Sequence, residues 1–240
     1  MIKIDLLTKV FPGKSSAGAL GLSTCALIRT GEHTMLFDTG AHGVIKILEK
    51  SFADLGVSFA EVDTIFLSHL HYDHSNNVAK FPSAEIIVGK KEWEYAHQSL
   101  DEWTPLEMIQ YLDRERRVRL VDDGEKIFEG MTALFVPGHT PGQMALELDT
   151  PDGILVLAGD AVKNRSELEQ EFADQSVDTS LSEASIRRIK KIADRVLPGH
   201  DGYLRIENGK VIPEDVLTLD IFLPKGCTNG DHGNYHLRCD

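Results

Sequence analysis

The run of residues 62–69, VDTIFLSH, constrains the fold most, because it is short and almost wholly apolar. A strand of this kind is buried on both faces, which places it in a sheet that other layers cover. The run at 84–90, AEIIVGK, has the same character and leads into a predicted helix at 90–100. Further helices are expected at 43–56 and at 104–115, where Thr104 is the expected N-cap.

Strands joined by turns account for much of the remaining chain. Strands are expected at 2–11, 23–30 and 34–40, and again at 131–138, 143–150 and 153–160. An amphipathic helix capped by Ser182 is expected at 182–194, with a short strand after it at 195–200. Hairpins mixed with strand–helix units predict an α+β sandwich, in which helices cover a pair of sheets. Residues 1–240 are expected to form a single domain, with 222–240 as a polar C-terminal tail.

The composition argues against several partners. The chain has 38 acidic and 25 basic residues and a net charge of −13, which disfavours binding to nucleic acid or to an anionic membrane. No signal peptide is recognisable, and no apolar run approaches the roughly 18 residues of a transmembrane helix. Cys25, Cys227 and Cys239 are too scattered for a disulfide framework, so a cytoplasmic location is expected.

A dense group of histidines follows the first buried strand. Residues 68–74, SHLHYDH, contain three histidines and an aspartate. His69 and His71 are two positions apart, so on an extended segment their side chains point to the same side. Asp73 and His74 follow where the chain must turn, and they can reach a neighbouring point. This order predicts one loop that serves two metal positions.

Three further candidates lie downstream, each after a predicted strand and beside glycine: His139, Asp160 and His200. Each alone is better explained as a turn, cap or surface residue than as a ligand. Together with the first loop they supply the three or four ligands that each metal of a catalytic zinc site needs, and a carboxylate can bridge two ions. The sequence thus predicts two divalent ions held by His69, His71, Asp73, His74, His139, Asp160 and His200.

The motifs from LFDTG (36–40) to LPGHD (197–201) resemble those of the metallo-β-lactamase superfamily. The resemblance implies an αββα sandwich with the site at one rim of the two sheets. It implies a first metal on His69, His71 and His139, and a second on Asp73, His74 and His200, with Asp160 as the bridge. Asp38 either supports this site from outside or caps a turn. Zinc is the expected metal, although iron, manganese or cobalt suit the same ligands.

Within the superfamily, HLHYDH, AEIIVGKKEWEYA, VPGHTPGQMALEL and PGHD are most similar to the N-acyl-homoserine-lactone lactonase branch. This resemblance implies a hydrolase that opens a lactone or cleaves a related ester, with Asp73 carrying the proton of the leaving group. Asp160 replaces the cysteine of β-lactamases proper, and His71 replaces the glutamate of the diiron branch. Lys163 stands about where lactonases have a tyrosine that holds the substrate carbonyl.

Other functions stay open on the sequence alone. A phosphodiesterase or nuclease, or a glyoxalase II-like thioesterase, would use the same two-metal site, and a non-catalytic binder could have kept the ligands. The acidic charge disfavours the nuclease, and the complete ligand set disfavours the binder. The expected partner is therefore a small-molecule ester or lactone, with no nucleic acid and no membrane, and the chain is compatible with a homodimer.

Two weaker features have two interpretations each. The aromatic residues Trp93, Tyr95 and Trp103 line a substrate pocket or form the core of a helix pair. The tail contains four side chains that could hold a structural zinc, although their spacing matches no strong motif: Cys227, His232, His236 and Cys239.

Overall fold

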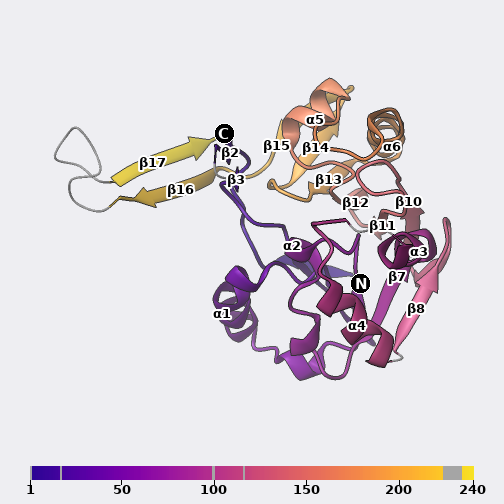
Figure 1. The fold of residues 1–240 in the computed structure, drawn as a ribbon. Coiled ribbons are helices and arrows are strands. Elements are labelled where there is room, and N and C mark those ends of the chain that lie inside the picture. The colour runs from indigo at the N-terminus through magenta and orange to yellow at the C-terminus, as the bar shows by residue number, and fades with distance from the viewer. Residues whose placement is uncertain (1, 17, 99–100, 116, 224–233) are drawn as a thin grey trace.

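Two β-sheets packed face to face form the centre of the protein (Figure 1). The computed structural model describes residues 2–16, 18–98, 101–115, 117–223 and 234–240. The first sheet has the order β1 (Lys3–Leu6), β4 (Ala26–Arg29), β5 (Thr34–Phe37), β6 (Thr64–Phe66), β7 (Glu85–Gly89) and β8 (Val118–Val121). The second has the order β15 (Lys210–Pro213), β14 (Leu204–Glu207), β13 (Arg195–Pro198), β12 (Gly153–Gly159), β11 (Met144–Thr150), β10 (Met131–Phe135) and β9 (Lys126–Phe128).

Helices cover the outer faces of both sheets, which confirms the predicted αββα sandwich (Figure 1). The first sheet is covered by α1 (Ile45–Leu55), α3 (Lys90–Gln98) and α4 (Leu106–Glu115). The second is covered by α5 (Arg165–Gln170) and α6 (Thr179–Ile192). A single short helix, α2 (Tyr72–Ser75), follows β6.

Alternating side chains of the strands supply three apolar layers. In β5, Met35 and Phe37 pack between the sheets, whereas Leu36 packs against the helices of the first sheet. In β6, Phe66 faces the second sheet and Ile65 faces the helices. Both faces of these strands are therefore buried, as their apolar sequence predicts.

The predicted start of helix α6 was wrong. Helix α6 begins at Thr179, and its N-cap is Asp178, whose side chain accepts a hydrogen bond from the backbone N–H of Leu181 at 3.0 Å. Ser182 lies inside the first turn and is buried. Both residues are good caps by type, and Ser182 instead packs closely against Gly138.

The strand directions bring several loops to one rim of the sandwich. Strands β5, β6 and β7 run parallel, and so do β12 and β13 in the other sheet. The carboxyl ends of parallel strands meet at one edge, so the residues after β5, β6, β12 and β13 come together. These are the segments that contain Asp38, His69, Asp160 and His200.

The C-terminal part of the chain forms a hairpin. Strand β16 (Leu217–Phe222) pairs antiparallel with β17 (Asn234–Cys239), and the hairpin extends away from the two sheets (Figure 1). Within the described part of the predicted tail, Asn234–Cys239 is therefore a strand. Another small hairpin joins β2 (Lys14–Ser15) to β3 (Gly18–Ala19). The organisation of 1–240 as a single domain stays a prediction.

The tail zinc site cannot be judged as a set, since Cys227 and His232 lie outside the described residues. His236 Nδ1 lies 2.8 Å from the Asp220 carboxylate, and Cys239 is a free thiol.

Within the described ranges, no helix has both the length and the apolar character that crossing a membrane requires.

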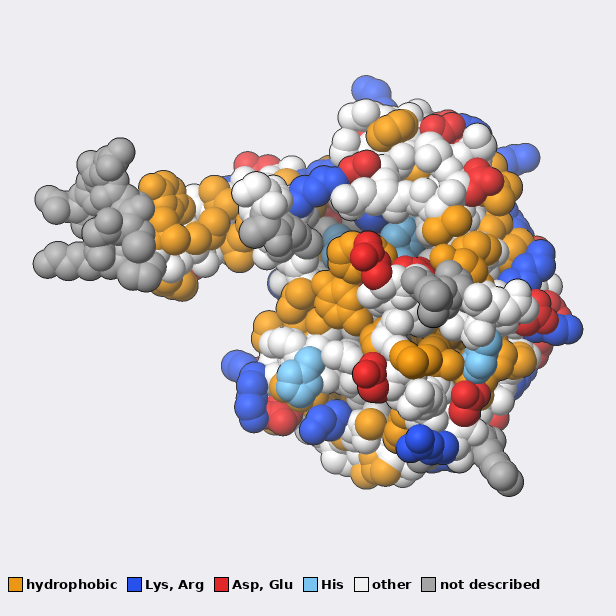
Figure 2. Space-filling model, viewed as in Figure 1, with side chains coloured by type: hydrophobic (Ala, Val, Ile, Leu, Met, Phe, Trp, Pro, Cys, Tyr) orange, Lys and Arg blue, Asp and Glu red, His pale blue; other side chains and the backbone are white. Residues whose placement is uncertain are grey.

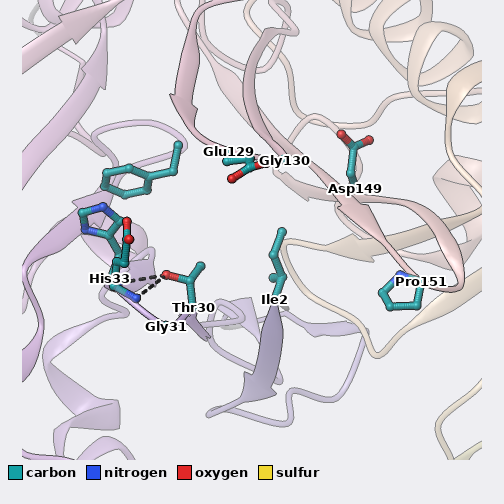
Figure 3. Close-up of a pocket in the computed structure, with 10 residues that line it drawn as sticks. Ile2, Thr30, Gly31, His33, Glu129, Gly130, Asp149 and Pro151 are labelled. Atoms are coloured by element: carbon teal, nitrogen blue, oxygen red, sulfur yellow. Dashed lines mark hydrogen bonds between the residues drawn. The ribbon is translucent and has the colours of Figure 1, made fainter.

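A cavity of about 770 Å³ lies at the rim of the sandwich opposite the loops that contain His139 and Asp160 (Figure 3). It is formed by the turns at 30–33, 128–130 and 149–151, and the ring of His33 stacks on Phe128 with centroids 3.7 Å apart. These turns lie at the far ends of β10, β11 and β12 from His139 and Asp160. None of the seven predicted ligands lines this cavity.

Candidate metal centre

The first three predicted ligands converge. His69, His71 and His139 offer ring nitrogens that all lie within 4.8 Å of one another. Their ring centroids are 4.5 to 5.0 Å apart. His69 and His71 come from the segment after β6, and His139 comes from the loop after β10 in the other sheet.

Three of the other four predicted ligands form a second group beside the first. Asp73, His74 and His200 bring their ligand atoms within 4.8 Å of one another. Asp160 lies between the two groups. Its Oδ1 is 3.2 Å from His74 Nε2 and 3.3 Å from His200 Nε2, whereas its Oδ2 is 3.5 Å from His139 Nε2. The two oxygens of this carboxylate therefore face different groups of ligands.

Contacts outside the centre orient the imidazole rings. His71 Nε2 lies 3.0 Å from Asp101 Oδ2, and His139 Nδ1 lies 3.1 Å from the Gln175 carbonyl. Both partners are acceptors, so these nitrogens carry the proton, and a neutral imidazole has only one. The inward nitrogens, His71 Nδ1 and His139 Nε2, then face each other as two lone pairs 3.1 Å apart. A cation between them resolves this repulsion.

The same pattern holds at His69 and His74. His74 Nδ1 donates to Asp38 Oδ2 at 2.7 Å, and His69 Nδ1 lies 3.0 Å from Ser68 Oγ, which itself donates to Asp38. The inward Nε2 atoms of both rings, and Asp160 Oδ1, are buried without a well-formed hydrogen bond. Leaving such atoms unpaired costs about 1–3 kcal/mol each. Nitrogen and carboxylate ligands in this arrangement fit divalent metal ions.

Burial keeps two of the imidazoles neutral. It lowers the pKa of His69 well below its usual value, and neighbouring histidines lower it further. Burial also lowers the pKa of His139 to about 3, against the opposing charge of Asp160. Both rings therefore present lone pairs at neutral pH, as metal ligation requires.

The second group has the opposite electrostatic character. Burial lowers the pKa of His74, but the carboxylates of Asp73, Asp160 and Asp38 outweigh it and raise this pKa well above its usual value. Burial raises the pKa of Asp160, yet the charges of His200 and His74 bring it well below its usual value. An environment that holds a proton so firmly also favours a divalent cation in its place.

Asp38 supports the centre from the loop after β5. It is fully buried, and it accepts hydrogen bonds from the Ser68 backbone N–H at 2.7 Å and from His74. Its φ of 54° lies in the left-handed region, which aspartate tolerates better than most residues. Of the two interpretations of Asp38, support of the site is the one that these contacts favour.

Glycine allows the close approach of two ligand loops. A Cβ added to Gly199 would overlap Asp160 Oδ1, and the Gly199 backbone N–H donates to the Gly159 carbonyl at 2.9 Å. Any side chain at 199 would therefore push the carboxylate away from His200.

We expect Gly199→Ala to weaken metal binding while leaving the sandwich folded, because the added methyl meets the Asp160 carboxylate most closely and otherwise only the Gly159 backbone beside it. The measurement is bound metal per chain after dialysis, with Gly31→Ala as a control at a turn that has open space around it. Both variants are purified by the same procedure. Equal metal content in the two variants would contradict the role of Gly199.

Glu92 is a functional candidate that the sequence did not reveal. This α3 residue is fully buried and accepts hydrogen bonds from the Leu70 backbone N–H at 3.0 Å and from Thr140 Oγ1 at 2.6 Å. It thus ties the loop of His69 and His71 to the loop of His139. A glutamate on a charged helix predicts a solvated side chain, so no pattern in the sequence pointed to this role.

Aromatic and aliphatic side chains border the centre. The rings of Tyr72 and Trp103 are stacked, with centroids 6.1 Å apart, and they are 38% and 53% exposed as residues. Val177, 61% exposed, donates its backbone N–H to the His139 carbonyl at 3.2 Å. Histidine is visible in a hollow with hydrophobic side chains around it (Figure 2). Trp93, by contrast, packs against the core of the first sheet.

Lys163 follows Asp160 by three residues and lies near the centre. Its ammonium is 2.9 Å from Glu167 Oε1, with side chains 13% and 6% exposed. Its charge contributes to the low pKa of His139, after burial and other nearby charges. Its carbonyl accepts the His200 backbone N–H at 2.8 Å, so the loop joins two ligands.

Several curated proteins similar to this chain are lactonases. An N-acyl homoserine lactonase of Bacillus cereus is 27% identical over 220 residues, which cover 79% of this chain and 85% of that protein. An N-acyl homoserine lactonase of a Bacillus species is 30% identical over 166 residues, 66% of this chain and 64% of that protein. These relatives agree with the predicted enzyme class, a metal-dependent hydrolase.

Solved structures share the fold. The dizinc quorum-quenching lactonase AidC has a TM-score of 0.68 at 21% identity, covering 80% of this chain and 79% of that chain. A quorum-quenching N-acyl homoserine lactone lactonase has a TM-score of 0.65 at 24% identity, covering 83% and 91%. The family model described as the metallo-beta-lactamase superfamily matches residues 18–200, more than half of the chain. The chain belongs to the metallo-beta-lactamase superfamily.

Proposed function

We propose that this protein is a dinuclear metal-dependent hydrolase that opens the ring of a lactone, with N-acyl-homoserine lactones as the first substrate class to test. The observation that carries this proposal is the placement of Asp160, whose two oxygens face two separate groups of nitrogen ligands. One ion would be held by His69, His71 and His139. The other would be held by Asp73, His74 and His200, with Asp160 shared.

A bound pair of divalent ions supplies Lewis acidity and lowers the pKa of a water to about 7, so that hydroxide is available at neutral pH. The ligands fit zinc, and iron, manganese or cobalt are the alternatives. Zinc is the ion proposed here, supported by the dizinc structure with the same fold.

The side chains themselves provide positioning and proton transfer. Asp73 Oδ2 lies 3.5 Å from His200 Nε2 and 3.7 Å from His74 Nε2. Its side chain remains 17% exposed, so it is the ligand carboxylate best placed to touch a substrate. We assign it the proton that the alkoxide leaving group needs, as well as a role in metal binding. Asp38 and Asp101 hold His74 and His71 in the orientation that binding requires.

The border of the centre favours an apolar acyl substrate over a phosphodiester. Tyr72 and Trp103 offer exposed aromatic surface next to His71, and the exposed Val177 contacts His139 through its backbone. The cation near the centre, Lys163, is already paired with Glu167. This border, together with the net charge of −13, opposes a polyanionic substrate.

Lys163 is proposed to hold the substrate carbonyl, since an ammonium has three donors and the Glu167 contact uses one. We expect Lys163→Met to lower kcat/KM by about 10²-fold, the loss typical of removing one such donor. Glu167 stays hydrogen-bonded in this variant, because its two oxygens accept the backbone N–H groups of Lys163 and Asp174. Lys163→Arg keeps a cationic donor and should retain more activity than Lys163→Met, and melting curves establish that both variants fold. Full activity in Lys163→Met would remove the proposed contact with the substrate carbonyl.

The experiment that tests the proposed function is a substrate panel. The zinc-loaded protein is assayed with N-acyl-homoserine lactones of several chain lengths, simple esters, a glutathione thioester, a β-lactam and a phosphodiester. Lactone hydrolysis with the highest kcat/KM supports the proposal. A higher kcat/KM for the thioester would instead indicate a thioesterase, and a higher kcat/KM for the phosphodiester would indicate a phosphodiesterase or nuclease. A homodimer and a cytoplasmic location stay predictions.

A further inference from the structure

Asp101 holds His71 from outside the centre. The distance between His71 Nε2 and Asp101 Oδ2 is 3.0 Å, and both side chains are only 9% exposed. The opposite nitrogen, Nδ1, faces His139. This contact therefore determines which nitrogen of His71 is turned toward the other ligands.

The same carboxylate organises a short turn. Asp101 Oδ1 accepts the backbone N–H of Trp103 at 3.0 Å, and Oδ2 accepts the Tyr95 hydroxyl at 3.3 Å. The Asp101 carbonyl accepts the backbone N–H of Thr104 at 3.1 Å.

Trp103 closes a ring of contacts that returns to the ligands. Its carbonyl accepts the backbone N–H of Tyr72 at 2.8 Å, and its indole stacks on the Tyr72 ring. Tyr72 stands between His71 and Asp73 in the chain. The turn that carries the exposed indole is thus connected to the ligand loop at two points, one of them through the Asp101 carboxylate.

We propose that Asp101 is a positioning residue that couples the binding of a divalent ion at His71 to the placement of Trp103 at the border of the site. The proposal rests on the proposed two-metal centre. An ion on His71 Nδ1 fixes the ring proton on Nε2, which is the proton that Asp101 accepts. Metal binding therefore strengthens the hydrogen bond from His71 to Asp101. The same Asp101 carboxylate accepts the backbone N–H of Trp103. The apolar border of the site is ordered by the metal before any substrate arrives.

Asp101→Asn tests the positioning role, because an amide has one acceptor oxygen. It can accept from His71 or from Trp103 but not from both, and its NH₂ group then faces a donor. Glu102→Gln is the matched control, since this exposed neighbour loses the same charge. Zinc affinity is measured by competition with a chromophoric chelator. We expect Asp101→Asn to bind zinc about 10- to 100-fold more weakly, and Glu102→Gln to bind it normally.

Trp103 fluorescence tests the coupling. The chain has two tryptophans, so Trp93→Phe leaves Trp103 as the emitter. We expect zinc to shift the Trp103 emission in Trp93→Phe alone and in Trp93→Phe with Glu102→Gln. We expect no shift in Trp93→Phe with Asp101→Asn. Asp101→Glu keeps two acceptor oxygens and should recover part of both effects. Melting curves of the chelated variants establish that each one folds.

Two results would overturn the proposal: zinc affinity in Asp101→Asn equal to that of the control, or a Trp103 response that is the same with and without the carboxylate. Asp101→Glu behaving no better than Asp101→Asn would also count against it. Both readouts are independent of turnover. A zinc-loaded protein that opens no lactone therefore refutes the proposed function while leaving the Asp101 result to stand by itself.

Discussion

Asp160→Asn is expected to lower kcat/KM for lactone hydrolysis by 10³-fold or more, which corresponds to about 4 kcal/mol of transition-state stabilisation. The variant keeps the shape of the side chain and removes the negative charge that faces His74 and His200 on one oxygen and His139 on the other. With that charge removed, the two groups of ligands no longer share an anionic ligand. Steady-state kinetics after zinc loading measure the effect.

Asp152→Asn is the matched control, because this exposed aspartate lies at the turn before the same strand, β12, at its other end. It should retain full activity. Melting temperatures of both variants distinguish lost chemistry from lost folding. Near-normal turnover in Asp160→Asn would remove the shared carboxylate from the mechanism.

Removal of bound metal by a chelator is expected to lower the melting temperature by roughly 8–16 °C. A ligand at about 1,000 times its dissociation constant stabilises the folded state by about 4 kcal/mol, and each kcal/mol shifts the melting temperature of a chain this size by about 2–4 °C. The physical reason is that His71 Nδ1 and His139 Nε2 face each other 3.1 Å apart without the cation. Differential scanning calorimetry with and without chelator measures the shift.

Addition of zinc after the chelator is removed should restore the original melting temperature, which excludes irreversible damage. The same treatment of Asp160→Asn should give a smaller shift, because fewer ligands remain. A melting temperature that is the same in both forms would mean that the cluster does not bind metal in the folded protein.

Much of the fold was predictable because buried strands have an unmistakable composition. The apolar runs that became β6, β7, β11 and β12 were identified, and helix α1 ends at Gly56 in a left-handed conformation, as its glycine predicts. Strands β8, β9, β14 and β15 were missed. They are short, lie at or near sheet edges and carry charged side chains, so they lack the apolar signal.

Hairpin β16–β17 was missed for a different reason. Leu217, Leu219 and Ile221 alternate with polar residues, but their partner strand lies beyond a long polar connection. Pairing of this kind depends on a distant segment, which local pattern does not reveal. The polar composition of 222–240 favoured a tail instead.

The metal ligands were easier to predict from the sequence than the residues that hold the ligand loops in place. Its seven candidate ligands have a dense local motif and repeated strand–glycine–ligand patterns, and the structure brings all seven together. Glu92 and Asp101 have no such pattern. Each acts through one contact with a loop far away in sequence, so only the folded chain reveals them.

The most direct test of the account is a crystal structure of the zinc-loaded protein with anomalous data at the zinc edge. The account predicts two peaks, one within coordination distance of His69, His71 and His139 and the other within coordination distance of Asp73, His74 and His200. Asp160 should contact both. A map with no peak at this cluster, or with a single peak that Asp160 does not touch, would contradict it.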